Sequence, residues 1–361
     1  MQLLPKLYLA DKTGNLGDDI THIVTSGSVT YDPDRSIKFN LALEVNDHTA
    51  ITPYRDCVAP FLTTRSDDGY EVTSQLGLYS VVPPPQEVTQ SKRNISLDGR
   101  DLTWLLASDV FADGYNLSTG TNIVNAVISI LNGAGFSNRS VIQPSNKTLS
   151  QTASWPAATS KLRVINDLLL GIGYYTLTMS KDGRFTSYPY RSVTKSGVNV
   201  RYDTTDRTAR IGVVGSVSLD STPDRIANKI VVVKESTNEP PIVATAINSN
   251  PNSPTSTVSL GTTIAKVYKD STILDQDAAD ALATKYLETA SMQYNKVTLY
   301  TQPDVQRDIN EIYELNVVDA KGSVVTHGRW YCRGWSIGFT PSDGPMEHQL
   351  SNVDDPAIDL A

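Results

Sequence analysis

The four histidines are the residues best suited to proton transfer or metal binding near neutral pH. They are scattered through the 361 residues without the short spacing typical of metal ligands, at His22, His48, His327 and His348. The chain also lacks the GxGxxG, GxxxxGK(S/T), HExxH and GxSxG patterns of common phosphate, metal and nucleophile sites. We therefore expect no catalytic, cofactor-binding or metal-binding residues and a protein that is not an enzyme. A zinc site assembled from distant residues is the weaker alternative.

The two cysteines do not form a disulfide framework or a redox motif. Cys57 and Cys332 are far apart, and neither belongs to a CxxC pair. We expect two reduced, mostly buried thiols.

The acidic clusters are typical of turns and helix ends. Pairs beside Gly, Ser or Pro are expected to be solvated turn residues: Asp18–Asp19, Asp67–Asp68 and Asp354–Asp355. Asp275, Asp277 and Asp280 are spaced like part of a calcium loop, but the glycine and the distal bidentate Glu of that loop are missing. These three residues precede or begin a helical pattern, where negative charge is favourable, so helix capping is the better interpretation.

The tryptophans could stack on sugars, but most lie in patterns that predict a core. Trp104 lies on an amphipathic helical pattern, and Trp330 and Trp335 lie on alternating strand patterns. Trp155 precedes Pro156 in a predicted loop, and its role is the least determined by the pattern. A glycosidase would need two spaced carboxylates, and 39 acidic residues make some pair inevitable, so this idea has no support from the sequence.

Composition and charge narrow the class of protein further. Hydrophobic residues make up 39% and charged residues only 19%, with 22 Gly and 19 Pro, which favours short strands and turns in a mainly β chain. The net charge is -8, and no basic stripe suited to binding phosphates is present. The longest apolar stretch is interrupted by Arg163, Asn166 and Asp167, and the N-terminus lacks a signal-peptide pattern, so we expect no membrane span and no secretion signal.

The hydrophobic periodicity divides the chain into β-rich and helical parts. Residues 36–45 alternate as a half-buried strand does, whereas 101–111, 121–135 and 159–173 have helical patterns and 174–190 resembles a hairpin turning at 181–183. After a strand through Ile230 to Val233, residues 240–265 contain no charge. This stretch is predicted to be extended or looped and to be an interface arm. A helix at 275–290, capped by Asp275 with Leu274 as a hydrophobic staple, precedes further strands. A bulge at Arg333–Gly334 would place Trp330 and Trp335 on one face.

Four passages of the sequence carry a resemblance to a known family through their order along the chain. The first is TASWPAATSKLRVINDLLLGIGYYTLTMSKDGRFTSYPY. The second is VSLDSTPDRIANKIVVVKESTNEPPIVATAINSNPNSPTS, in which Asn228 introduces a strand and Glu239 to Pro241 and Asn250 to Thr255 follow. The third is the Asp- and Ala-rich helix at 275–290, and the fourth is GWSIGFTPSDGPMEHQL. In this order and spacing the chain from Trp155 onward resembles the minor tail proteins of actinobacterial siphophages, which are similar to the baseplate hub of contractile phages. SLDGRDLTWLLASDVF resembles the segment where such hubs leave their first barrel.

The resemblance implies an α+β, mainly β fold with two β-barrel-like tube domains and α+β insertions. It assigns 1–100 to the first barrel-like domain, 101–190 to an α+β insertion, 191–235 with 296–361 to the second barrel-like domain, and 236–295 to a loop-plus-helix insertion. It implies a homotrimeric ring at the distal tip of a phage tail, assembled in the host cytoplasm. The implied partners are distal tail, tail tube, tape measure and other tail-tip proteins, with transient passage of DNA and no catalytic residues.

Two other functions compete with this interpretation. A carbohydrate-binding, adhesin-like tail protein would need an exposed aromatic platform, with Trp155 as a candidate member. A hydrolytic tail enzyme would need a catalytic Asp or Glu. The hub of a contractile injection system is so similar to a phage hub that the sequence does not separate the two.

Overall fold

The structure is a computed structural model of the chain. It describes residues 1–46, 50–82, 95–206, 209, 211–214, 217–220, 226–234, 241–270, 272–292, 296–353 and 358–360. His48, Pro83 to Pro85 and Asp354–Asp355 lie outside the described residues, as does most of the Glu239 to Pro241 passage. The fold is mainly β with large antiparallel sheets, which confirms the predicted class.

The largest sheet runs through both ends of the sequence. In the described part of the chain it has 14 strands, and its main path runs β17-β21-β24-β23-β3-β4-β8-β7-β5-β1-β2. The N-terminal strands are β1 (Gln2–Ala10), β2 (Leu16–Asp19), β3 (Val24–Tyr31), β4 (Phe39–Val45), β5 (Cys57–Arg65), β6 (Glu71–Gln75), β7 (Tyr79–Val82) and β8 (Ile95–Asp101). The later strands are β16 (Val200–Asp203), β17 (Ser218–Asp220), β21 (Lys296–Thr301), β22 (Ile312–Val318), β23 (Val324–Gly338) and β24 (Met346–Asn352).

Strand β4 shows why these segments form a sheet. Phe39, Leu41, Leu43 and Val45 are buried, while the residues between them are half-buried or exposed. Alternation of this kind places one face of a strand on a core and the other toward solvent. The predicted strand is confirmed, although it begins at Phe39 and leaves Ile37 in the preceding turn.

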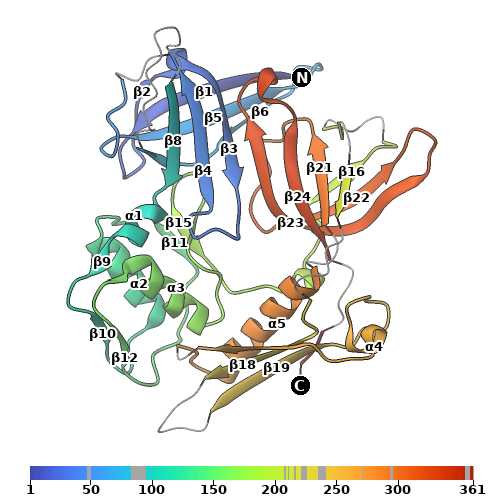
Figure 1. Ribbon diagram of the computed structural model, residues 1–361. Helices are drawn as coiled ribbons and strands as arrows, with labels where there is room; N and C mark the ends of the chain where they lie inside the picture. Colours follow the sequence, from blue (N-terminus) through green and yellow to red (C-terminus); the bar gives the residue numbers. More distant parts are fainter. Residues whose placement is uncertain are drawn as a thin grey trace.

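The joint between the N-terminal and C-terminal strands is the antiparallel pair β3–β23. Trp335 pairs with Tyr31 and Gly338 pairs with Ser28, so residues about three hundred positions apart are neighbours. The two units predicted as barrel-like therefore share one sheet, in which the blue and red strands of Figure 1 lie side by side. The register of β23 against β24 shifts between Cys332 and Gly334, so the bulge that the sequence pattern left open is present. As a result Trp330, Cys332 and Trp335 are all buried.

The inserted unit packs below the first sheet. Its helices are α1 (Thr103–Ser108), α2 (Ile123–Gly133) and α3 (Lys161–Gly171). Its short strands are β9 (Val110–Phe111), β10 (Tyr115–Leu117), β11 (Ser140–Ile142), β12 (Ala153–Trp155), β13 (Thr159–Ser160), β14 (Thr178–Met179) and β15 (Phe185–Ser187). Asn122 and Ser160 cap α2 and α3 through their side chains. The predicted helices and the hairpin are confirmed.

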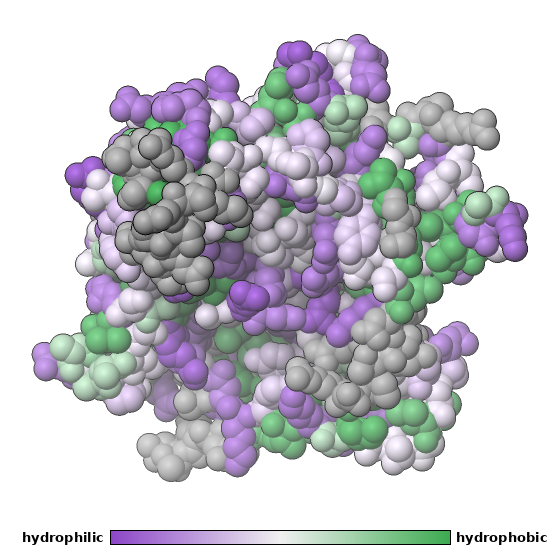
Figure 2. Space-filling view, turned by 45° about the horizontal axis from the view of Figure 1, so that its top comes forward, coloured by the Kyte–Doolittle hydropathy of each residue, from purple (hydrophilic) through white to green (hydrophobic). Residues whose placement is uncertain are grey.

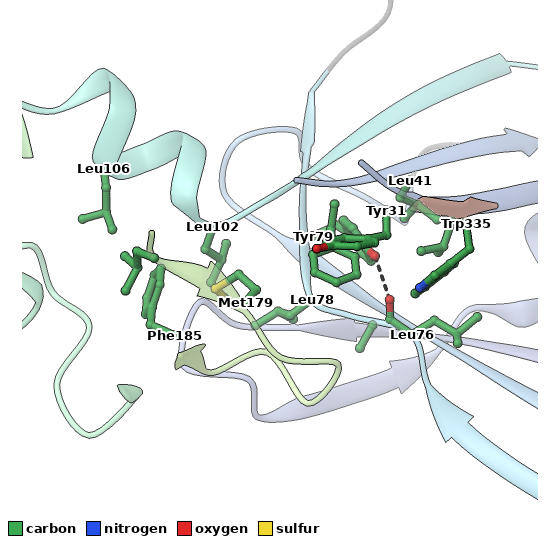
Figure 3. Close-up of a cluster of buried hydrophobic side chains, with 14 of the residues drawn as sticks. Tyr31, Leu41, Leu76, Leu78, Tyr79, Leu102, Leu106, Met179, Phe185 and Trp335 are labelled. Carbon is green, nitrogen blue, oxygen red and sulfur yellow. Dashed lines mark hydrogen bonds between the residues drawn. The ribbon is translucent and has the colours of Figure 1, made fainter. Parts of the chain in front are cut away.

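One hydrophobic core connects this unit with the large sheet. Figure 3 shows Leu102 and Leu106 beside Met179 and Phe185 at one end, and Tyr31 and Trp335 at the other. Between them the Tyr79 hydroxyl donates to the Leu76 carbonyl at 2.7 Å, which satisfies a buried polar group inside the core.

A second core lies under a separate four-stranded sheet of β18 (Lys229–Lys234), β19 (Ile242–Asn248), β20 (Ala265–Lys269) and β25 (Ile358–Leu360). The helix α5 (Gln276–Met292) covers one face and packs on Ile230, Val232 and Ala244. Figure 1 shows α5 lying along this sheet at the bottom of the molecule. β18 thus pairs with β19 and β20, whereas the sequence-based division grouped it with the strands after residue 296.

The uncharged segment 240–265 is extended over part of its length, which is one of the two predicted alternatives, and it is not one long loop. It contains all of β19 and the one-turn helix α4 (Thr257–Leu260). Ala244 and Ala246 are buried while Val243 is exposed, so the segment alternates as a half-buried strand. Three 3-10 turns complete the described elements, at Thr21–Ile23, Val193–Lys195 and Pro341–Asp343.

We predict that Gly334→Ala destabilises the joint between the two ends of the chain. A Cβ at residue 334 would lie 2.7 Å from the backbone oxygen of Tyr31, so β3 or β23 must shift. We expect the free energy of unfolding to fall by about 1–3 kcal/mol, as for other overpacked positions, measured by urea denaturation. Gly197→Ala, where a Cβ would meet open space, is the control and should leave stability almost unchanged. Equal stability of both variants would contradict the prediction.

Candidate functional site

The three histidines that the structure describes do not form a common site. His22 and His327 are exposed, and His348 is fully buried. No group of three His, Cys, Asp or Glu residues suited to a metal ion occurs among the described residues. The His348 ring contacts the Thr301 hydroxyl through Nε2 at 2.9 Å and the Tyr313 hydroxyl through Nδ1 at 3.1 Å. Burial lowers the pKa of His348 to about 3, with the charge of Arg307 as a smaller cause, so this ring is a neutral part of the core at neutral pH.

We predict that His348 makes the fold sensitive to acid. The unfolded chain would bind a proton near pH 6.5, whereas the folded chain binds it only near pH 3. The stability contribution is therefore complete above pH 6.5 and is lost as pH falls from 6.5 toward 3, by about 1.4 kcal/mol per pH unit. His348→Gln should show a shallower loss of unfolding free energy between pH 6.5 and 4.5 in urea titrations.

The control for this experiment is His327→Gln, because His327 is exposed. It should keep the pH slope of the unaltered chain. If His348→Gln has that same slope, the histidine is not the source of the acid sensitivity.

The cysteines are inert structural residues. Both are free and buried, as predicted, and burial raises the pKa of Cys57 and of Cys332 to about 12. A thiol with such a pKa is protonated at neutral pH and is a poor nucleophile.

Of the three acidic residues near α5, Asp275 caps the helix, as predicted. The Asp275 side chain accepts a hydrogen bond from the Ala278 backbone nitrogen at 2.9 Å and forms an ion pair with Lys147 at 2.8 Å. Asp280 accepts from the Gln276 side chain at 2.8 Å. These contacts are those of a helix N-terminus and not of a calcium loop.

The tryptophans do not form an exposed platform. Trp330 and Trp335 are 2% exposed, and Trp155 is 8% exposed and donates its indole N–H to Asp167 at 3.0 Å. Trp104 is half-buried, with its ring 6.4 Å from that of Tyr54. The aromatic platform required by a sugar-binding protein therefore cannot be built around Trp155.

Sequence reasoning missed two buried carboxylates that connect elements. Asp101 accepts hydrogen bonds from the backbone nitrogens of Phe39 and Thr103, both at 2.9 Å, and burial raises its pKa. Glu288 of α5 is fully buried and accepts from the Tyr190 and Ser192 hydroxyls and, at 3.2 Å, from the Val193 nitrogen. Apart from Thr103, the partners named here lie 62 to 98 residues away in the sequence, so no local motif could identify these links. Both carboxylates are structural links, because donors of the protein itself hydrogen-bond to their oxygens.

The surface with the clearest potential for binding is the face of the four-stranded sheet opposite α5. We define the outer face as Val231, Val233, Val243 and Val267. Val231 pairs with Val267 and Val233 pairs with Val243, so these side chains form two adjacent cross-strand rows. Val243 is 46% exposed and Val267 is 56% exposed. Nearby, Val258, Leu260 and Ile264 are also exposed.

The face drawn in Figure 2 is largely purple and white, with separate green patches. The four valines of the outer face are instead adjacent to one another on paired strands. Concentrated exposed apolar side chains usually mark a contact with another protein.

No helix in the described part of the chain is long and apolar enough to cross a membrane.

Comparisons with known proteins identify the fold. No protein-family model and no curated protein matches the sequence. Among solved structures, a tail protein from Neisseria meningitidis MC58 superposes with a TM-score of 0.69 at 12% identity, covering 99% of this chain and 98% of that one. A 43 kDa tail protein of prophage MuSo2 from Shewanella oneidensis gives 0.63 at 13% identity, covering 98% and 100%. The chain has the fold of phage tail proteins.

The same fold extends to secretion machinery. A component of the type VI secretion system of E. coli, described as similar to bacteriophage T4 tail proteins, gives a TM-score of 0.50 at 9% identity and covers 93% of this chain and 74% of that one. The tail-protein part of the resemblance found in the sequence is thus supported by the fold. These structures come from Neisseria, Shewanella and E. coli, so they do not single out the actinobacterial siphophages.

Proposed function

We propose that this chain is a structural hub protein at the distal tip of a phage tail and not an enzyme. Three copies would form a ring that continues the tail tube and gives passage to the tape measure protein and to DNA. The observation that carries the proposal is the match of the whole fold to solved phage tail proteins, which covers 98% or more of both chains in two cases. The ordered sequence passages from Trp155 onward, which resemble actinobacterial siphophage proteins, point to the same role.

The surface chemistry supports assembly. Closing three copies into a ring needs heterologous interfaces, in which two different patches of the same chain meet. The outer face supplies one apolar patch, flanked on its own strands by Lys229 and Lys269. Two copies of net charge -8 repel each other overall, so the facing surface of the second copy would need acidic residues opposite these lysines. The distal tail, tail tube and other tail-tip proteins would be the remaining partners, in a virion assembled in the host cytoplasm.

The negative net charge of the chain also suits a channel through which DNA passes. A lumen with few positive charges would repel phosphates and would let DNA slide without being held. A basic channel wall in the assembled ring would contradict this part of the proposal.

A second candidate is the hub of a contractile injection system. It is favoured by one observation, the shared fold with the type VI secretion component. In that case the ring would sit beneath a spike rather than at the tip of a long tail.

The location is tested by imaging. Negative-stain images of intact tails labelled with an antibody to this chain should show a three-fold ring at the distal tip. Label along the tube shaft would identify a tube protein, and label beneath a spike in a contractile particle would favour the second candidate. Either result would overturn the tail-tip assignment.

The assembly is tested by a matched pair of substitutions. Mass photometry of the purified chain should show a trimer, and Val267→Lys should raise the dissociation constant at least ten-fold, because it places a charge in a desolvated apolar contact. Val324→Lys changes a similarly exposed valine on the distant β23 hairpin and should leave the trimer intact. A monomer for the unaltered chain would contradict the ring, and an intact Val267→Lys trimer would exclude the outer face as its interface.

A further inference from the structure

A cavity of about 130 Å³ lies between the large sheet and α5. Its walls come from five parts of the chain: the turn between β3 and β4, the hairpin of β14 and β15, the helix α5, residues 309–310 before β22, and the strand β23. These elements converge near the middle of the molecule in Figure 1. A cavity of roughly 150 Å³ can hold a benzene molecule, so this one has room for a small polyatomic ligand.

Two lysines line this cavity, and the carboxylate whose charge acts on Lys38, that of Asp101, is not part of the cavity wall. Lys38 Nζ donates to the Thr176 hydroxyl at 2.8 Å, and Lys285 Nζ lies 5.4 Å from the centre of the Tyr175 ring. No ion pair of either lysine occurs among the residues that the structure describes. The other charged residues of the wall, Asp34 and Arg333, neutralise one another in an ion pair. The wall therefore carries a surplus of two positive charges.

Burial of the two ammonium groups in the cavity wall disfavours their charged forms. Burial lowers the pKa of Lys285 to about 8, and burial together with the charge of Lys285 lowers the pKa of Lys38 to about 8. At pH 7 both groups still carry their proton. Buried charges are normally paired, so an anion between them would remove an unfavourable interaction.

A buried hydroxyl in the wall also lacks a partner. Thr178 is 4% exposed and lines the cavity, and its Oγ1 makes no hydrogen bond to any described residue. Figure 3 shows the next residue, Met179, in the hydrophobic core beside Leu102. Since successive side chains of a strand alternate in direction, Thr178 lies on the opposite face, toward the cavity. Buried polar atoms without a partner are rare in native proteins, and each asks for an explanation.

We propose that this cavity binds a small oxyanion, of the phosphate or carboxylate class, between Lys38, Lys285 and Thr178. The ammonium groups would donate charge-assisted hydrogen bonds to its oxygens, and the Thr178 hydroxyl would donate a third. The anion would connect the β3–β4 turn of the large sheet with α5, which covers the separate sheet. It would thereby hold the four-stranded sheet in place relative to the large sheet. This inference does not depend on the proposed function.

The experiment uses the full chain at pH 7 and inorganic phosphate as the probe. Thermal unfolding in sodium phosphate is compared with sodium chloride at the same ionic strength, and the phosphate affinity is measured by isothermal titration calorimetry. We expect phosphate to raise Tm with increasing concentration and chloride to have no such effect, because a ligand that binds only the folded state stabilises it. Sulfate and acetate, tested in the same way, show whether four oxygens or a carboxylate fit better.

Three variants assign the effect to the cavity. Lys38→Met and Lys285→Met should each weaken phosphate binding at least ten-fold, since each removes a charge-assisted hydrogen bond. Thr178→Val keeps the shape and should weaken binding several-fold. Lys321→Met, which removes an exposed lysine in the β22–β23 turn, is the matched control and should bind phosphate as the unaltered chain does.

Two results would overturn the proposal. One is an equal Tm in phosphate and chloride for the unaltered chain. The other is phosphate binding by either cavity lysine variant that is as tight as that of the unaltered chain or of Lys321→Met. If a methionine variant fails to give a folded circular dichroism spectrum, the Thr178→Val variant tests the site in its place. Phosphate binding by Thr178→Val as tight as that of the unaltered chain would then contradict the proposal.

Discussion

The antiparallel pairing of β3 with β23 is the constraint on which the rest of the structure depends. It brings residues 28–31 against residues 335–338 and so makes one sheet from the two ends of the chain. Around it, the rings of Tyr31, Phe39 and Trp335 pack within about 6 Å of one another, and the Thr30 and Ser336 hydroxyls meet at 3.1 Å. Closing so long a loop has a large entropic cost, although that cost grows slowly with length. A buried aromatic cluster and a continuous ladder offset it.

The same joint determines where the buried charges lie. The β3–β4 turn that follows β3 carries Asp34, which pairs with Arg333, and Lys38, which enters the cavity beside α5. Asp101 and Glu288 have protein donors for their oxygens, whereas Lys38 and Lys285 form no ion pair among the described residues, although the charge of Asp101 acts on Lys38. Satisfied carboxylates hold elements together, and ammonium groups without an ion pair have donors left for a ligand.

Local patterns predicted the elements that are decided by their own residues. The alternation of β4 and the Asp275 cap depend on side chains within a few positions, and both are confirmed. The strand β19 was not distinguished from a loop because its uncharged surroundings are rich in Ser, Asn and Pro. Its alternation becomes meaningful only beside β18, which supplies the ladder and the core under Ala244.

By itself, the sequence determined a mainly β chain with helical insertions, no recognisable catalytic motif, buried cysteines, and an order of passages that resembles phage tail hubs. These properties depend on composition, on short periodicities and on local spacing. Only the tertiary structure decided that both ends of the chain share one sheet, that β18 belongs with β19, and that Lys38, Lys285 and Thr178 face one cavity. The physical reason is that strand pairing and charge burial depend on contacts between residues up to three hundred positions apart, to which no local pattern is sensitive.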